Sequence, residues 1–167
     1  MYPLARSARY GRARSRTLVG YWNDPEQTAR ALTPDGWLRT GDLGRVDEAG
    51  RIFLVDRAKD LVISGGENVY PVEVENVLAA HPLLTEVAVI GVPHERWGET
   101  VKAIVVARAG AELDQDDVIG FVRQRLASFK CPTSVDFVAT LPRTATGKVL
   151  KHLLREPYWH GYDRRIN

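Results

Sequence analysis

The sequence predicts an α+β fold, with a small mixed sheet that is covered by helices and preceded by a β-hairpin. Hydrophobic residues make up 44% and charged residues 26% of the 167 residues, which is typical of globular proteins. From residue 60 onward, strand-like and helix-like patterns follow one another in the order β-α-β-β-α-β-α. This order predicts helices packed over one sheet.

The distribution of charge and cysteine limits the possible partners and compartment. We expect residues 1–18 to be a disordered, arginine-rich arm, because five of the 23 basic residues and none of the 21 acidic residues lie there. The remainder is net negative, which argues against nucleic acid as a partner. No apolar run approaches the length of a membrane span. Cys131 is the only cysteine, which excludes an internal disulfide and favours a cytoplasmic location.

The region before residue 60 is predicted to contain a helix and a hairpin. Residues 24–33 favour a helix, because Asp24 can cap its first turn and Pro25 suits the first helical position. Two apolar runs in residues 43–57 flank the polar stretch 47–50, a pattern that indicates a hairpin.

The region after residue 60 begins with a strand, a helix and two further strands. Residues 61–66 predict a short strand that ends in glycines, and Pro71 opens a helix that Pro82 ends. The inward face of this helix is expected to consist of Val74, Val77, Leu78 and His81. The β-branched runs at 86–92 and 101–108 predict two buried strands.

The last part of the chain is predicted to add a helix, a strand and a closing helix. Residues 113–129 favour a helix with Asp114 as its N-cap, and residues 134–140 predict a strand. Residues 146–159 predict the closing helix. Its inward residues are expected to be Val149, Leu150, Leu153 and Leu154.

Lys148 lies in the stretch LPRTATGKVL and is the first candidate for chemistry. A phosphate-binding P-loop needs a glycine five residues before Gly147 and a Ser or Thr after the lysine, whereas the chain has Pro142 and Val149 there. A lone lysine near a helix start either binds an anion or is simply solvated. The P-loop is therefore excluded, and the other two interpretations stay open.

Other signals are weak when taken one at a time. Gly65 and Gly66 lack dinucleotide-binding spacing, and they either form a tight turn or let a ligand approach the backbone. Asp42, between glycines, can bind a ribose diol or cap its own turn. The charged run 56–60 is typical of a solvated connector. The histidines and the single cysteine show no metal-ligand spacing, so no metal site is predicted.

Three blocks in order make a specific pattern. They are GYWNDPEQTARAL through DGWLRTGDLGRVDEAGRIFLVDRAKDLVISGGENVYPVEVENVL, then EVAVIGVPHERWGE, then PRTATGKVLKHLLRE. Residues 19–159 thereby resemble the C-terminal end of the acyl-adenylate-forming ligases, the AMP-binding enzyme superfamily. The stretch SGGENVYPVEVE is most like that of fatty-acid and other acyl-CoA synthetases. The resemblance implies the fold of their mobile C-terminal domain.

The resemblance implies roles in the first half-reaction for four residues. Asp42 and Arg57 match residues that hold the ribose of ATP and of acyl-AMP. Lys59 falls on the hinge position, about which the small domain swings relative to the large one. Lys148 matches the catalytic lysine of the adenylation step, where an ammonium stabilises the charge that develops on phosphate oxygens.

The resemblance also implies a CoA-binding loop. Gly65 and Gly66 match the loop that lines the pantetheine tunnel during thioester formation. In some relatives a basic residue contacts the CoA nucleotide at the position of Cys131. This chain therefore departs from the pattern there, and Lys130 or Arg143 would have to substitute.

The implied organisation has four parts after the arm. These are a remnant of the large N-terminal domain at 19–57, a hinge at 58–59, the C-terminal domain at 60–157 and a tail at 158–167. The implied reaction converts a carboxylic acid, ATP and CoA into acyl-CoA, AMP and pyrophosphate. The large domain would bind Mg2+, and we therefore expect this chain to be incomplete alone. Two alternatives are a non-catalytic fragment or docking module that acts with a separate N-terminal domain, and the adenylation-domain lid of a peptide synthetase.

Overall fold

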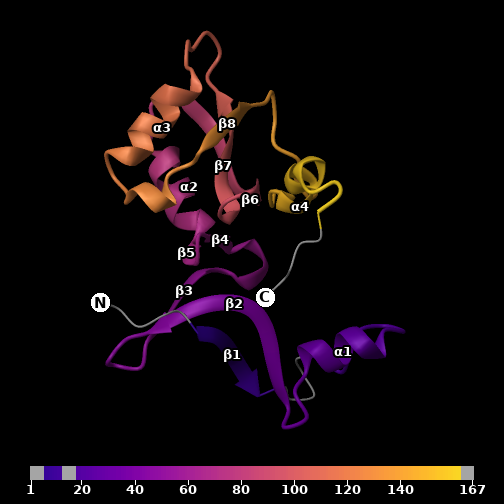
Figure 1. The fold of residues 1–167 in the computed structure, drawn as a ribbon. Coiled ribbons are helices and arrows are strands. Elements are labelled where there is room, and N and C mark those ends of the chain that lie inside the picture. Colours follow the sequence, from indigo (N-terminus) through magenta and orange to yellow (C-terminus); the bar gives the residue numbers. More distant parts are fainter. Residues whose placement is uncertain (1–5, 13–17, 163–167) are drawn as a thin grey trace. The chain divides into compact units, whose positions relative to one another are not determined.

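The computed structural model describes residues 18–162 and the backbone of residues 6–12. The rest of the predicted arm and of the predicted tail, 1–5, 13–17 and 163–167, lies outside the described residues. The chain divides between Lys59 and Asp60 into two compact units, each with its own sheet (Figure 1). Among the described residues, no helix is both long and apolar enough to cross a membrane.

The first unit is an antiparallel sheet with one short helix. Its elements are β1 (Arg6–Arg12), α1 (Pro25–Ala31), β2 (Trp37–Val46) and β3 (Ile52–Arg57), with strand order β1-β2-β3. Asp24 caps α1 by accepting a hydrogen bond from the Gln27 amide, as predicted. The predicted hairpin at 43–57 is confirmed, and Asp47 fixes its turn by accepting hydrogen bonds from the Ala49 and Arg51 amides.

The structure differs from the expectation of a disordered arm at residues 6–12. These residues form β1, which pairs with β2, and two register shifts interrupt the pairing. The physical reason is that the outer edge of β2 presents backbone N–H and C=O groups that need partners. Arginine content alone does not reveal such a pairing.

The second unit is the predicted small mixed sheet with helices. Its elements in chain order are β4 (Val62–Ser64), β5 (Glu67–Val69), α2 (Pro71–Ala79), β6 (Leu84–His94), β7 (Gly98–Ala107), α3 (Gln115–Arg123), η2 (Ser128–Lys130), β8 (Ser134–Phe137), α4 (Lys151–Arg155) and η3 (Glu156–Tyr158). The 3₁₀ helix η1 (Ala58–Asp60) crosses the boundary between the units. The strand order is β5-β4-β7-β6, and β8 pairs with β7 in parallel.

Helices cover both faces of this sheet. In Figure 1, α2 and α3 lie on one side of the strands and α4 lies on the other. The first face holds the larger core, to which α2 contributes Val74 and Leu78 and α3 contributes Val118. The second face holds a smaller cluster around Ile90 and Ile104. The two faces therefore present different surfaces of one rigid sheet.

The predicted end of helix α3 was wrong, and one short strand, β5, was not predicted. Asp114 caps α3 in a reciprocal capping box with Asp117, but the helix ends at Arg123 rather than at 129. Arg125 donates a hydrogen bond from its guanidinium to the Phe121 carbonyl, which caps the end of the helix. Strand β5 was not predicted, because three residues are too short a run to show alternation.

The closing helix is shorter than the sequence predicts. It was expected at 146–159, whereas α4 begins at Lys151. Gly147 has a φ of +84°, which no helical residue adopts, and Val149 forms an antiparallel bridge with Arg143. Leu153, expected to face inward, is 43% exposed. The lysine therefore lies on a hairpin rather than at the start of a helix.

Candidate functional site

Lys148 lies on a small hairpin formed by residues 142–150. The Thr144 amide donates to the Lys148 carbonyl at 2.8 Å, and the Lys148 amide donates to the Thr144 hydroxyl oxygen at 3.1 Å. The Leu150 amide donates to the Pro142 carbonyl at 2.8 Å. The side chain of Lys148 is exposed, and no described residue forms an ion pair with it. The hydrogen-bonded hairpin thus presents the Lys148 ammonium to solvent.

Arg143 anchors this hairpin to the sheet. Its Nε donates to Glu86 on β6 at 3.0 Å, its Nη2 forms an ion pair with the same carboxylate, and its Nη1 donates to the Gly147 carbonyl at 2.7 Å. One guanidinium therefore holds both the strand and the turn of the hairpin. These contacts occupy three of the five N–H donors of Arg143, so its suggested role as a substitute cation stays a prediction.

Gly65 and Gly66 form the turn between β4 and β5. Their φ angles are +58° and +87°, a left-handed conformation that glycine adopts without strain. The Gly65 amide donates to the Trp97 carbonyl at 3.1 Å. A Cβ on Gly65 would touch the Trp97 ring at 3.5 Å, whereas a Cβ on Gly66 would point into open space. The turn requires glycine for its backbone and leaves room beside it.

An open pocket of about 980 Å³ begins at this turn. It lies on the same face of the sheet as α3, and its wall includes Gly65, Trp97, Ile119, Arg123, Phe129 and Thr133. The indole of Trp97 stacks on the His94 ring, with the two centroids 4.6 Å apart, and is itself 41% exposed. The pocket therefore combines aromatic surface and hydroxyl groups with one guanidinium, that of Arg123, and two carboxylates, those of Glu67 and Asp116.

The basic residues near the pocket differ in what they already bind. The Lys130 ammonium lies 2.7 Å from both carboxylate oxygens of Glu73. The Arg123 guanidinium is exposed on the pocket wall and has no ion-pair partner among the described residues. Burial raises the pKa of the Cys131 thiol, and the nearby charge of Arg123 opposes that rise. Arg123 is thus the available cation beside position 131, a role that the sequence analysis missed.

Asp42 and Arg57, the predicted nucleotide-binding residues, lie together in the first unit. They are opposite each other in the pairing of β2 with β3, and the Arg57 Nε lies 3.6 Å from an Asp42 carboxylate oxygen. The side chain of Asp42 is 28% exposed and that of Arg57 is 55% exposed. Both polar groups can therefore reach a ligand from solvent.

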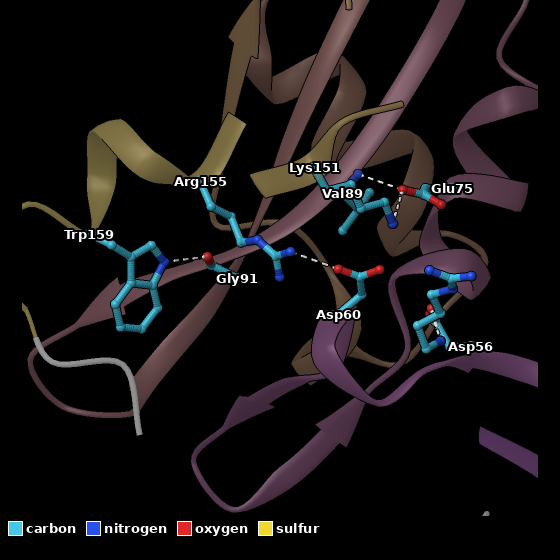
Figure 2. A network of polar contacts seen from close by, with 9 residues as sticks. Asp56, Asp60, Glu75, Val89, Gly91, Lys151, Arg155 and Trp159 are labelled. Atoms are coloured by element: carbon cyan, nitrogen blue, oxygen red, sulfur yellow. Dashed lines mark hydrogen bonds and ion pairs between the residues drawn. The ribbon is translucent and has the colours of Figure 1, made fainter. Parts of the chain in front are cut away.

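Lys59, the predicted hinge residue, is an exposed member of η1, and Asp60 follows it. The run 56–60 is not uniformly solvated, because Asp60 is only 9% exposed. Its carboxylate accepts a hydrogen bond from Arg155 Nη2 at 2.7 Å, as Figure 2 shows. The sequence does not reveal this ion pair, because its partners are 95 residues apart.

Further polar contacts fasten the C-terminal segment to the sheet. Tyr158, assigned by the sequence to a tail, donates to Asp136 on β8, and Asp136 also accepts from the buried Lys102. Burial and the hydrogen bond to Asp136 raise the pKa of Tyr158 to about 12. Trp159 donates from Nε1 to the Gly91 carbonyl at 3.0 Å (Figure 2). Residues 158 and 159 are therefore integral to the second unit.

The second unit holds its two predicted functional loops on opposite faces of the sheet. Val149, beside Lys148, packs against the smaller cluster, whereas the pocket at Gly65 is walled by Ile119 of the larger core. The structure therefore does not bring Lys148 together with the glycine turn. Within the described ranges, no cluster of His, Cys, Asp and Glu could hold a metal ion.

Comparisons with known proteins show the family to which this domain is similar. Residues 73–148 match the family described as the AMP-binding enzyme C-terminal domain. A substituted-propanoyl:CoA ligase from Rhodococcus jostii is 55% identical over 139 residues, which are 83% of this chain and 27% of the relative. The fatty acid–acyl-carrier-protein ligase ScoC from Streptomyces coeruleorubidus is 47% identical over 150 residues, 90% of this chain and 29% of its own length.

A solved structure gives the same result. ATP-bound MatB from Rhodopseudomonas palustris superposes with a TM-score of 0.78 at 48% identity, over 87% of this chain and 29% of that one. The chain thus spans less than a third of the length of these relatives. Residues 73–148 are an AMP-binding enzyme C-terminal domain, and the chain belongs to the acyl-adenylate-forming ligases as the counterpart of their C-terminal portion, most like that of the acyl-CoA synthetases.

Proposed function

We propose that the chain acts as the C-terminal domain of an ATP-dependent carboxylic acid–CoA ligase, in which Lys148 is the catalytic residue of adenylation. The observation that carries this proposal is the exposed ammonium on an anchored hairpin. Lys148 differs in this respect from Lys130, which is paired with Glu73. An unpaired cation on a fixed backbone is suited to a charge that appears only when substrate is bound.

The first half-reaction explains what this cation does. A carboxylate oxygen attacks the α-phosphorus of ATP, the bond to the bridging oxygen breaks, and pyrophosphate leaves with the electron pair. Negative charge grows on the phosphoryl oxygens during this step. At an effective dielectric constant of 20, an ammonium about 4 Å from that charge contributes roughly 4 kcal/mol. Lys148 is the group that we assign to this role.

The second half-reaction uses the other face of the sheet. The CoA thiolate attacks the acyl carbon of acyl-AMP and AMP leaves with the electrons of the broken bond. We assign the turn of Gly65 and Gly66 to the pantetheine arm, because the bare backbone leaves room beside Gly66. The adjoining pocket, with Trp97 and Phe129 in its wall, is suited to the CoA nucleotide.

The nucleotide and hinge assignments follow from the first unit. The Asp42 carboxylate can accept hydrogen bonds from both hydroxyl groups of a ribose. Arg57, which lies beside it, can orient that carboxylate or donate to the ribose itself. We assign the hinge to residues 58–59, because the boundary between the units follows Lys59. The remnant at 19–57 and the domain that begins at residue 60 remain proposals, and the contacts of Tyr158 and Trp159 extend that domain through residue 159.

The partner that we propose is a large adenylation domain, either in the same polypeptide or separate. It would supply the acyl pocket and the ATP phosphate site, and it would hold Mg2+, which neutralises phosphate charge when bound. One face of the β2–β3 hairpin supports a covering partner, since Val46, Ile52 and Leu54 are 61%, 52% and 67% exposed. ATP and CoA as substrates favour a cytoplasmic location.

A second candidate is transfer of the acyl group to the pantetheine thiol of a carrier protein. ScoC, 47% identical, is named for that reaction. A carrier-bound pantetheine has no 3′-phosphorylated nucleotide, so it needs no basic residue at the position of Cys131. The pairing of Lys130 with Glu73 is compatible with this candidate, because it removes one CoA-binding cation. The Arg123 guanidinium, which forms no ion pair with any residue that the structure describes, favours CoA instead.

The test is complementation by a joined enzyme. The full chain is fused behind the N-terminal portion of MatB, in place of the region to which it is 48% identical. Acyl-CoA formation from the MatB substrate, ATP and CoA is then followed by chromatography. We expect turnover that the N-terminal portion alone does not give. A soluble, folded fusion without turnover would instead support the non-catalytic alternative.

A further inference from the structure

Helix α4 directly follows the Lys148 hairpin and is held at both of its ends by ion pairs. At its first residue, Lys151 Nζ lies 2.7 Å from Glu75 Oε1 on α2. At its last residue, Arg155 Nη2 lies 2.7 Å from Asp60 Oδ1. Figure 2 shows both contacts, with Lys151 directed toward Glu75 and Arg155 toward Asp60. Five residues of helix are too few to be stable without such contacts.

The Arg155–Asp60 pair is buried at a special place in the chain. Arg155 is 7% and Asp60 9% exposed, so both charges have lost most of their hydration. A buried ion pair gains little net stability over well-packed apolar side chains, because desolvation offsets the attraction between the charges. A hydrogen-bonded ion pair does, however, fix the relative position and orientation of the two segments that carry it more narrowly than apolar contacts do.

The position of Asp60 in the chain shows which two segments the ion pair holds together. Asp60 is the first residue of the second unit and directly follows Lys59. Arg155 is seven residues beyond Lys148, on the helix that continues from the lysine hairpin. The pair therefore joins the point where the chain enters the second unit to the element that carries the lysine.

Two hydrogen bonds to the backbone of β6 also help to hold the segment that contains α4 in place against the sheet. Glu75, which pairs with Lys151, also accepts a hydrogen bond from the Val89 amide at 2.8 Å. Trp159 donates to the Gly91 carbonyl. Figure 2 shows these contacts on either side of the Arg155–Asp60 pair. The segment thus has little freedom to slide along the sheet while the pair is intact.

We propose that Asp60 and Arg155 are positioning residues that fix the Lys148 hairpin relative to the hinge. The inference rests on the roles proposed above for Lys59 and Lys148. In this arrangement, rotation at the hinge carries the lysine as part of one rigid body. The pair touches no substrate and acts through Lys148.

The first test uses the 167-residue chain and does not depend on catalysis. In the double variant Asp60→Leu/Arg155→Met, apolar side chains replace the pair, and hydrogen exchange of backbone amides is measured by NMR. We expect exchange at Lys148 and Leu150 to be at least tenfold faster, while that of Val105 stays within twofold. The matched control is Glu73→Leu/Lys130→Met, which removes another ion pair of this unit and should leave Lys148 and Leu150 unchanged.

Two results would overturn the proposal. Exchange at Lys148 and Leu150 that equals the wild-type rate would show that the pair does not hold the hairpin. Equal acceleration of all amides would show that it serves global stability only. If the double variant does not fold, the variant Arg155→Lys is used instead, because it keeps the charge but loses the planar guanidinium. Hydrogen exchange at the Lys148 and Leu150 amides is then measured in the same way and decides between the same outcomes.

The second test separates the two half-reactions in the joined enzyme. In Asp60→Leu/Arg155→Met, we expect adenylation to fall at least tenfold, while thioester formation from preformed acyl-AMP stays within twofold. A merely structural role would lower both rates together. An inactive parent fusion would count against the proposed function, whereas the exchange measurement would still decide the role of the pair.

Discussion

Single basic side chains near the two functional loops differ in whether a partner already satisfies them. Arg143 and Lys130 are bound to Glu86 and Glu73, whereas Lys148 and Arg123 have no ion-pair partner within the described ranges. A paired cation has little attraction left for a ligand, because it would first have to give up its carboxylate. Lys148 and Arg123 are therefore cations that we expect to meet phosphate groups.

Arg123 provides a prediction at this scale. In the variant Arg123→Gln, the affinity of the chain for CoA should fall about three- to tenfold, because one charge-assisted contact to the 3′-phosphate is lost. The affinity for dephospho-CoA, which lacks that phosphate, should not change. NMR titration of the Thr133 and Gly65 amides measures both. The control is Arg125→Gln, an exposed arginine stacked on Phe121. An equal loss for both ligands would contradict the assignment.

Predictability from sequence also differs between residues. The neighbours of Lys148 drew attention to it but predicted a helix there instead of a hairpin. The roles of Asp42 and Arg57 came from the family resemblance, and the structure pairs the two residues across β2 and β3. The burial of Asp60 could not be predicted, since it depends on Arg155 at the far end of the unit. Arg123 was missed for a similar reason, because α3 brings it to a pocket whose wall comes from distant segments.

At the scale of elements, the end of α2 shows how a buried titratable group stabilises a boundary. His81 is 8% exposed, accepts a hydrogen bond from the Leu83 amide on Nδ1, and packs its ring against Phe121 of α3. Burial is the main cause that lowers the pKa of His81 below its usual value of 6.5; the charge of Asp117 opposes this change and that of Arg125 adds to it. The neutral ring is thus part of the folded contact.

The pH dependence of stability follows from this lowered pKa. Because the unfolded chain binds the proton more readily, the stabilisation is complete above pH 6.5 and is lost as the pH falls through the folded-state pKa. Chemical denaturation between pH 7.5 and 5 should show a falling free energy of unfolding, with up to about 1.4 kcal/mol per pH unit from this group. His81→Gln should flatten that slope. An unchanged slope would contradict the account.

Elements with strong local signals were predicted, and those made by distant contacts were not. The capped helices α1 and α3 and the long strands β6 and β7 carry their signals in consecutive residues. Strand β1 forms because it pairs with the edge of β2. The first residues of the predicted closing helix form a hairpin instead, which Arg143 holds by a hydrogen bond to the Gly147 carbonyl. Tertiary hydrogen bonds decided both cases, and no local pattern encodes them.

At the scale of the whole molecule, one small sheet separates the two loops for which we propose functions. The lysine hairpin belongs to the face covered by α4, and the glycine turn opens into the pocket on the face of α3. A single rigid unit with two such faces can serve two successive half-reactions by rotating at its boundary. This arrangement explains why the proposed adenylation and thioester groups do not meet within the unit.

The most direct test of this account is to measure the two half-reactions separately in the Lys148→Ala variant of the joined enzyme. Pyrophosphate release on mixing acid with ATP should fall about 10²- to 10³-fold, because the transition-state charge loses its ammonium. Thioester formation from preformed acyl-AMP should stay within twofold of the parent, and Arg125→Ala should leave both rates unchanged. Pyrophosphate release by Lys148→Ala at the parent rate would contradict the central claim.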